Sequence, residues 1–125
     1  MALAHRELTE QIIGAAIEVH RRLGPGFLES IYENALVIEL RKRGLSVEKQ
    51  LEVPVLYDEV EVGTHRLDLL IAGTIGVELK AIKALEDVHF AVVRSYLAAT
   101  RLEHGLLFNF ARPVLEIKRV FGPAA

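Results

Sequence analysis

The chain has 125 residues, 51% of them hydrophobic and 26% charged, with a net charge of −2 at pH 7; this predicts one globular domain over residues 1–125 and excludes a disordered chain. It contains no cysteine, which excludes disulfides, thiolate zinc sites and thiol catalysis and fits a cytoplasmic protein. Because there is no apolar run of about 18 residues, no signal-peptide pattern and no basic excess, no membrane partner is expected, and nucleic-acid binding would have to rest on a local basic patch.

Two amphipathic helices are predicted first. Apolar residues recur at three- and four-residue spacing from Leu8 to Leu23, and Gly24-Pro25 ends this helix. A second helix is predicted from about Leu28 to Arg43, with its inner stripe at Leu28, Ile31, Tyr32, Ala35, Leu36 and Leu40. Glu29 lies in its first turn, where the helix dipole favours a carboxylate, and it borders that stripe.

Three antiparallel strands are predicted between residues 47 and 80. The first runs from Val47 to Tyr57, with Pro54 indicating an edge or a bulge, and Asp58-Glu59 forms a turn. The chain resumes a strand at Val60. It then enters Arg66 to Ala81, RLDLLIAGTIGVELKA, where two alternating runs around Ala72-Gly73 predict a β-hairpin.

A third helix and two strands complete the chain. The helix is predicted from Leu85 to His104, closed by Gly105, and the strands from Leu106 to Phe110 and from Leu115 to Phe121. The order is therefore ααβββαββ. This order predicts an α/β (α+β) fold in which helices cover both faces of a mixed sheet, with the fourth strand parallel to a hairpin strand.

The central hairpin carries charged residues in an apolar setting. Glu78 and Lys80 share one face of their strand. An odd-length loop centred on Gly73 places Asp68 across from Glu78, whereas a two-residue turn places it across from Val77.

Two interpretations of these charges follow, because an ionised carboxylate is not buried without a partner. One is a salt bridge of Lys80 with Asp68 or Glu78. The other is a site in which the two carboxylates hold Mg²⁺ or Mn²⁺, while Lys80 orients a water or stabilises charge on a phosphate. The histidines His5, His20, His65, His89 and His104 show no metal-ligand spacing.

The segment GFLESIY, Gly26 to Tyr32, matches the GxxExxY signature of a family of small, mostly prokaryotic proteins. The resemblance continues through YENAL, RLDLL, VELKA, SYLAAT and GLLFNF, and covers the chain from about Ile13 to Val120. That family is grouped by similarity with the PD-(D/E)XK nuclease superfamily, whose core is a restriction-endonuclease-like mixed sheet flanked by helices.

The resemblance implies a site and its cofactor. Asp68, Glu78 and Lys80 correspond to the D…ExK residues, and Glu29 to an additional acidic residue. Asp68, Glu78 and Glu29 are then the ligands of Mg²⁺ or Mn²⁺, and the same three with Lys80 are the catalytic residues. The implied partners are nucleic acid, DNA more than RNA, and a second copy of the chain in a homodimer.

One residue departs from the resemblance. Related proteins often carry a Gln four residues before the Tyr of the third helix, where this chain has Val92 before Tyr96. A Gln amide can hold a phosphate or a water, which Val cannot. Three functions therefore stay open: a metal-dependent nuclease that hydrolyses phosphodiester bonds, a non-catalytic binding or assembly module with a degenerate nuclease fold, and a small metal-dependent nucleotide phosphohydrolase.

Overall fold

The computed structural model describes residues 2–123, which form three helices and one five-stranded sheet. In chain order the elements are α1 (Ala2–Leu23), α2 (Glu29–Lys42), β1 (Val47–Tyr57), β2 (Val60–Ile71), β3 (Ile75–Lys80), α3 (Asp87–Thr100), β4 (His104–Asn109) and β5 (Glu116–Phe121). The predicted α+β fold and its order ααβββαββ are confirmed. Across the same residues, no helix combines the length and the apolar character that a bilayer crossing requires.

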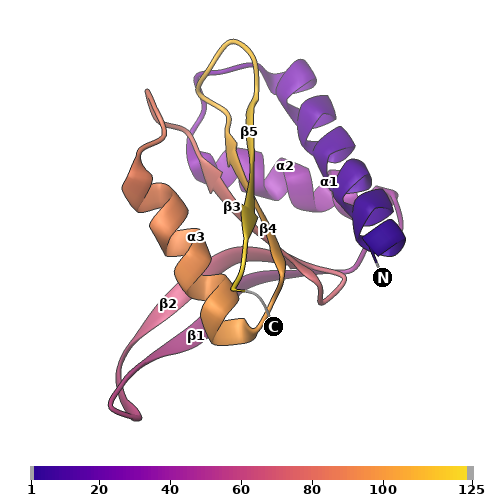
Figure 1. The fold of residues 1–125 in the computed structure, drawn as a ribbon. Coiled ribbons are helices and arrows are strands. Elements are labelled where there is room, and N and C mark those ends of the chain that lie inside the picture. Colours follow the sequence, from indigo (N-terminus) through magenta and orange to yellow (C-terminus); the bar gives the residue numbers. More distant parts are fainter. Residues whose placement is uncertain (1, 124–125) are drawn as a thin grey trace.

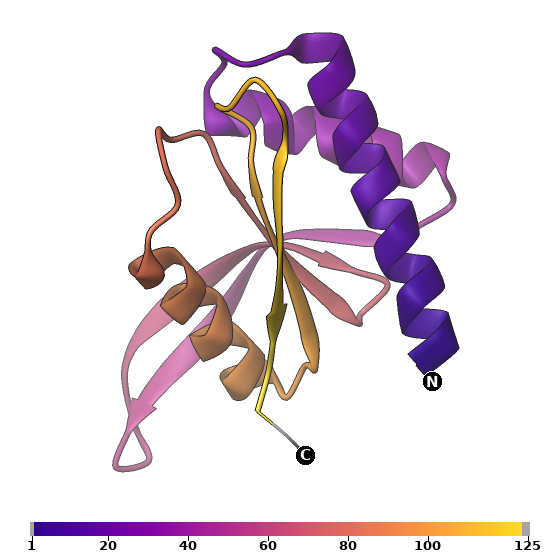
Figure 2. The same ribbon diagram turned by 45° about the horizontal axis from the view of Figure 1, so that its top comes forward.

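The sheet is mixed, in the strand order β1-β2-β3-β4-β5. All neighbouring strands are antiparallel except β3 and β4, which pair parallel. Helix α3 makes the crossover that a parallel pair requires, so the predicted parallel fourth strand is confirmed. Figures 1 and 2 show α1 and α2 on one side of the sheet and α3 on the other.

Pro54 predicted an edge strand or a bulge in β1, and the structure shows both. Strand β1 is an edge strand, and its register with β2 shifts between Val55 and Leu56. Beyond the other strands, β1 and β2 continue as a two-stranded arm (Figure 1). The turn at its tip is made by Asp58 and Glu59, which both have positive φ angles, 50° and 63°.

The core divides between the two faces of the sheet. Between the sheet and the α1–α2 pair lies the largest buried cluster, which includes Ile12, Tyr32, Leu36, Leu69, Val77 and Phe108. Under α3 lie two smaller clusters, one of Val93, Leu97, Leu107 and Val120, the other of Val53, Leu67 and Tyr96. Alternate residues of β3 therefore face opposite layers, so Glu78 and Lys80 point away from the main core.

Helix α2 is rotated relative to its predicted stripe. Leu28 and Ile31 are 72% and 40% exposed, whereas Tyr32, Leu36, Val37 and Leu40 are buried. The Tyr32 hydroxyl donates a hydrogen bond to the Gly24 carbonyl (2.6 Å) and accepts one from the Phe27 amide (3.1 Å), and the ring stacks on Phe110. These long-range contacts set the rotation of the helix, which the spacing of apolar residues alone did not reveal.

Helix α3 is shorter than predicted. It ends at Thr100 because Arg101 takes a left-handed conformation (φ 58°) and the Leu102 amide donates to the Leu97 carbonyl. His104, predicted as the last helical residue, instead begins β4, where it pairs with Ile75 and Phe121. The prediction ended the helix at Gly105, whereas the left-handed Arg101, which the sequence did not indicate, ends it four residues earlier than predicted.

Candidate metal centre on the central hairpin

The hairpin register brings two carboxylates together. Leu69 pairs with Val77 and Ile71 with Ile75, so the loop has odd length and is centred on Gly73. Beyond the Leu69–Val77 pair, the two strands are joined by hydrogen bonds from backbone amides to side-chain carboxylates rather than by backbone–backbone hydrogen bonds. The Asp68 amide donates to Oε1 of Glu78 (3.0 Å), and the Leu79 amide donates to Oδ2 of Asp68 (2.9 Å). Each carboxylate thus bridges the point where β2 separates from β3, and we call this pair the two-carboxylate site.

Burial makes both carboxylates hard to ionise. Glu78 is only 6% exposed, and its pKa is raised to about 7, first by burial and then by the charge of Asp68. Burial also raises the pKa of Asp68, against the opposing hydrogen bond from the Leu79 amide. A nearby cation would relieve both shifts, because it favours the charged form of each group.

Lys80 lies on the same face of β3 as Glu78, two residues further on. Its charge lowers the pKa of both carboxyl groups without cancelling the effect of burial. Within residues 2–123, the ion pairs shorter than 4.0 Å do not include one between Lys80 and either carboxylate. The salt-bridge interpretation of these residues is therefore not realised in the structure.

Two residues that the sequence reasoning missed contact the site. Gln50, on β1 between the Lys49–Leu69 and Leu51–Leu67 pairs, has a positive φ of 53°. Its Nε2 donates to Oε1 of Glu33 (2.8 Å) and reaches Oδ1 of Asp68 at 3.5 Å. Burial raises the pKa of Glu33, opposed by the Gln50 hydrogen bond, and the charge of Asp68 raises it further.

A sequence signal existed for Glu33 but not for Gln50. Glu33 lies one turn after Glu29, on the same face of α2 as Leu36 and Val37, and would have been found if the buried face had been placed correctly. Gln50 falls at a polar position in the alternation of β1, between Glu48 and Glu52, and its left-handed conformation could not be read from the pattern.

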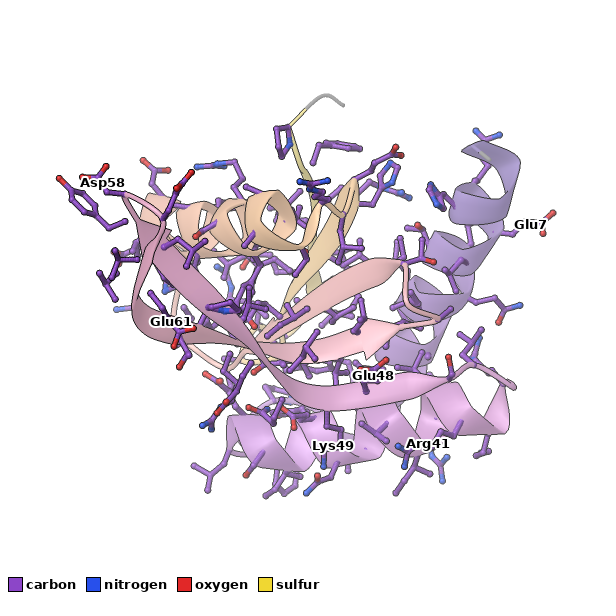
Figure 3. The ribbon with its side chains drawn as sticks, turned by 90° about the horizontal axis from the view of Figure 1, so that it is seen from below. Glu7, Arg41, Glu48, Lys49, Asp58 and Glu61 are labelled. Carbon is purple, nitrogen blue, oxygen red and sulfur yellow. The ribbon has the colours of Figure 1, made fainter. Side chains whose placement is uncertain are left out.

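Three side-chain contacts tie α2 to β1 and thereby hold Glu33 at the site. Besides the Gln50–Glu33 bond, Nζ of Lys49 donates to Oδ1 of Asn34 (3.0 Å), and Nη2 of Arg41 donates to the Val47 carbonyl (3.3 Å). Figure 3 shows Lys49 and Arg41 where β1 passes over α2. Helix α2 is thus fixed along much of its length against the strand that carries Gln50.

Glu29 is the first residue of α2 and is exposed. Its charge contributes to the raised pKa values of Glu78 and Glu33, so it lies within electrostatic reach of both. In the part of the chain that the structure describes, Glu29, Asp68 and Glu78 do not place three ligand atoms within 4.8 Å of one another. The structure therefore brings Asp68 and Glu78 together and leaves Glu29 at the outer margin of the site.

Helix α3 contributes an apolar wall and one hydroxyl. Tyr96 is 1% exposed, and burial raises its pKa, with the charges of Glu78 and Asp68 acting in the same direction. Its hydroxyl therefore stays protonated beside the carboxylates. Val92 packs against the cluster of Val53, Leu67 and Tyr96, so the position where related proteins often carry Gln is apolar here.

Asn109 holds the segment that follows Lys80. It is fully buried and pairs across the parallel ladder with Lys80. Its Oδ1 accepts from the Ile82 amide (3.1 Å), and its Nδ2 donates to the Ile82 carbonyl (2.9 Å) and to Oε1 of Glu116 (3.2 Å). The sequence signal was a single polar residue inside the apolar run Leu106 to Phe110, and reasoning from the sequence passed over it.

The donor set fits a hard divalent cation. Mg²⁺ and Mn²⁺ bind carboxylate oxygens and usually keep several waters, so two protein carboxylates suffice for a site. The backbone hydrogen bonds occupy Oε1 of Glu78 and Oδ2 of Asp68, and do not use the other oxygen of either carboxylate.

Comparisons with known proteins bear on the superfamily and on the fold. A sequence model described as the PD-(D/E)XK nuclease superfamily matches residues 6–120. A search among curated proteins found no significant match. The crystal structure of SSO0001 has a similar fold, with a TM-score of 0.58 and 18% sequence identity over 77% of this chain and 50% of that chain. The chain therefore spans about half the length of that protein, and the likeness concerns the fold alone.

Proposed function

Because the chain belongs to the PD-(D/E)XK nuclease superfamily, we propose that it is a metal-dependent nuclease that hydrolyses phosphodiester bonds of nucleic acid. Within the superfamily we assign it to the GxxExxY family, on the segment Gly26 to Tyr32. One observation supports the proposal above the others: the hairpin brings the Asp68 and Glu78 carboxylates together, with Glu78 accepting from the Asp68 amide and Asp68 from the Leu79 amide, and Lys80 follows on the same face as Glu78.

In this proposal the carboxylates bind the metal and Lys80 binds the phosphate. Asp68 and Glu78 hold Mg²⁺ or Mn²⁺, which when bound acts as a Lewis acid toward the phosphate and lowers the pKa of its water. Lys80 donates to a phosphate oxygen and stabilises the negative charge that develops there. Gln50 orients Asp68 and Glu33 through its amide. Glu29 is the additional acidic residue at the margin, and Glu33 shares that role.

The substrate is nucleic acid, DNA more than RNA, and the active form is a homodimer that embraces a duplex. The net charge of −2 provides no general attraction for a polyanion. Local cations beside the site compensate: Lys49 on β1, Lys80 on β3, and the exposed Lys83 just after it. Binding should therefore involve few phosphates and weaken only modestly with salt.

The test is cleavage of single- and double-stranded DNA and RNA in Mg²⁺ or Mn²⁺ by wild type and Glu78→Gln. The substitution keeps the shape and the hydrogen bond from the Asp68 amide while removing an anionic ligand, so we expect cleavage to be abolished. Glu61→Gln is the matched control, because Glu61 is exposed on the arm away from the site (Figure 3). Equal cleavage by wild type and Glu78→Gln would refute the proposal.

Val92 favours a second candidate, a non-catalytic binding or assembly module. Its apolar side chain cannot hold a phosphate or a water where related proteins often place an amide. In that case the wild type binds Mn²⁺ at Asp68 and Glu78 but releases no product from any nucleic acid. Phosphate release from free nucleotides, measured in the same assay, would instead identify a nucleotide phosphohydrolase.

A further inference from the structure

We propose that His5, Glu103 and His104 form a second metal site, for a transition-metal cation of the Zn²⁺ class. The three residues, which we call the histidine cluster, come from the start of α1 and from the junction that leads into β4. Nothing in the sequence pattern predicted this site, because the ligands lie about 100 residues apart along the chain.

The geometry of the cluster is close to that of a bound site. One potential ligand atom from each residue lies within 4.8 Å of the other two. Nδ1 of His5 is 3.9 Å from Oε2 of Glu103, and the two imidazole centroids are 5.0 Å apart in a T-shaped arrangement. Ligand atoms about 2.1 Å from a tetrahedral ion lie roughly 3.4 Å from one another. The cluster therefore needs only small side-chain adjustments to close on an ion.

One ring nitrogen supplies an independent observation. Nδ1 of His104 is buried and has no hydrogen-bond partner, and it is the one such side-chain atom among the described residues. A buried polar atom without a partner costs free energy, and native structures rarely leave one unexplained. Phe121 packs against the edge of the same ring, with centroids 5.3 Å apart, and limits its freedom to turn toward solvent. Coordination of a cation through this Nδ1 would remove the cost.

The donor set selects the kind of ion. Two imidazoles and one carboxylate suit Zn²⁺ and neighbouring transition metals, whereas Mg²⁺ prefers an all-oxygen set. A cavity of about 350 Å³ opens beside the cluster and leaves room for water as a fourth ligand. Arg6 and Arg119 also line it and oppose a cation, and the carboxylates of Glu10 and Glu103 offset their charge.

This site is separate from the two-carboxylate site. In the parallel ladder His104 pairs with Ile75, and Leu107 pairs with Glu78, so the two sites lie three strand residues apart along the sheet. That spacing corresponds to about 10 Å along the strand, and because successive side chains alternate, Ile75 and Glu78 face opposite sides of the sheet. A bound ion would join the start of α1 to the start of β4, and would therefore stabilise the fold rather than take part in phosphodiester chemistry.

The experiment measures Zn²⁺ binding to the full chain by calorimetry and thermal unfolding. The Asp68→Asn/Glu78→Gln double variant serves as the background, so that the two-carboxylate site does not contribute. We expect binding of one Zn²⁺ per chain and a rise in Tm, with no rise in Mg²⁺. Adding His5→Ala or Glu103→Gln should weaken Zn²⁺ binding at least ten-fold and remove the rise.

Both test residues are partly or largely exposed, so their variants should fold. Glu7→Gln, at an exposed position on α1 (Figure 3), and His65→Ala on β2 are the matched controls and should keep the affinity of the background. The proposal is overturned if the background protein binds no Zn²⁺, or if both cluster variants bind it as tightly as the controls do. Loss of nuclease activity plays no part in this test, so it stands apart from the proposed function.

Discussion

At the scale of single residues, the raised pKa of Glu78 shows that the buried site disfavours a second negative charge. Its carboxyl group has a pKa of about 7, compared with 4.5 for an ordinary Glu, because it is buried beside Asp68. A carboxyl whose pKa is raised by folding stabilises the folded state while protonated, and this stability is lost as the group ionises. The metal-free folded protein is therefore destabilised at neutral pH by the buried charge of Glu78, and a bound cation would offset this destabilisation.

A pH dependence follows. Glu78 contributes stability that is fully present below pH 4.5 and is lost as the pH rises through about 7. The rise in pKa from 4.5 to about 7 makes the lost free energy of unfolding about 3 kcal/mol. Urea unfolding in EDTA between pH 4.5 and 8.5 measures it as the difference between wild type and Glu78→Gln, in which the titrations of groups remote from Glu78 cancel. Above pH 7 Glu78→Gln should be as stable as wild type or more stable. Parallel stability curves for the two proteins would show that Glu78 does not titrate in this range.

Lys80 should separate catalysis from metal binding. Lys80→Ala removes the ammonium that stabilises phosphate charge but leaves both carboxylates, so Mn²⁺ affinity should change little while the cleavage rate falls by about 10² or more. Single-turnover cleavage at saturating Mn²⁺, together with calorimetric titration of Mn²⁺, distinguishes the two effects. Lys118→Ala is the control, since Lys118 is exposed on β5, an edge strand of the sheet two strands away from β3. A large loss of Mn²⁺ affinity in Lys80→Ala would contradict the role assigned to Lys80.

At the scale of elements, the start of α2 depends on one hydroxyl. Tyr32 ties the loop of Gly24 and Phe27 to the helix through two hydrogen bonds, and Gly24 and Gly26 have positive φ angles of 69° and 112°. The Gly and Tyr of the GxxExxY segment thus shape the turn that places Glu29 at the first helical position.

Removal of this hydroxyl should loosen the turn without emptying the core. Tyr32→Phe keeps the ring stacked on Phe110 and leaves the Gly24 carbonyl and the Phe27 amide without a partner. The expected cost is roughly 1–3 kcal/mol in the free energy of unfolding. Denaturant unfolding measures it, with Tyr57→Phe as the control because Tyr57 is 72% exposed on the arm. Equal stability of the two variants would mean that water replaces both bonds at no cost.

At the scale of the whole molecule, metal binding and folding should be coupled. The two-carboxylate site joins β2 to β3 and faces α3, so an ion bound there stabilises only the folded chain. The gain equals RT ln(1 + [L]/Kd), which is about 2.7 kcal/mol at a hundredfold excess over Kd. Thermal unfolding in Mn²⁺ and in EDTA should therefore differ for wild type and coincide for Glu78→Gln. A wild type indifferent to Mn²⁺, with Glu78→Gln strongly destabilised in EDTA, would indicate a structural role for the carboxylate instead.

Much of the hairpin could be predicted from the sequence because its information is local. Period-two alternation and the Gly73-centred loop decide which residues of β2 and β3 face each other. The same alternation places Glu78 and Lys80 on one face. The element order and the parallel β3–β4 pair followed for the same reason, since strand lengths and a crossover helix leave few arrangements.

Tertiary structure decided what depends on contacts between distant parts of the chain. The stacking of Tyr32 on Phe110 sets the rotation of α2, which turns Glu33 toward the site and leaves Leu28 exposed. The left-handed Gln50 and the early end of α3 likewise depend on packing that periodicity does not encode. The histidine cluster exists only because the start of α1 lies against the start of β4. Local periodicity determines which way a side chain points along its own element, whereas its neighbours from other elements are determined only by how those elements pack.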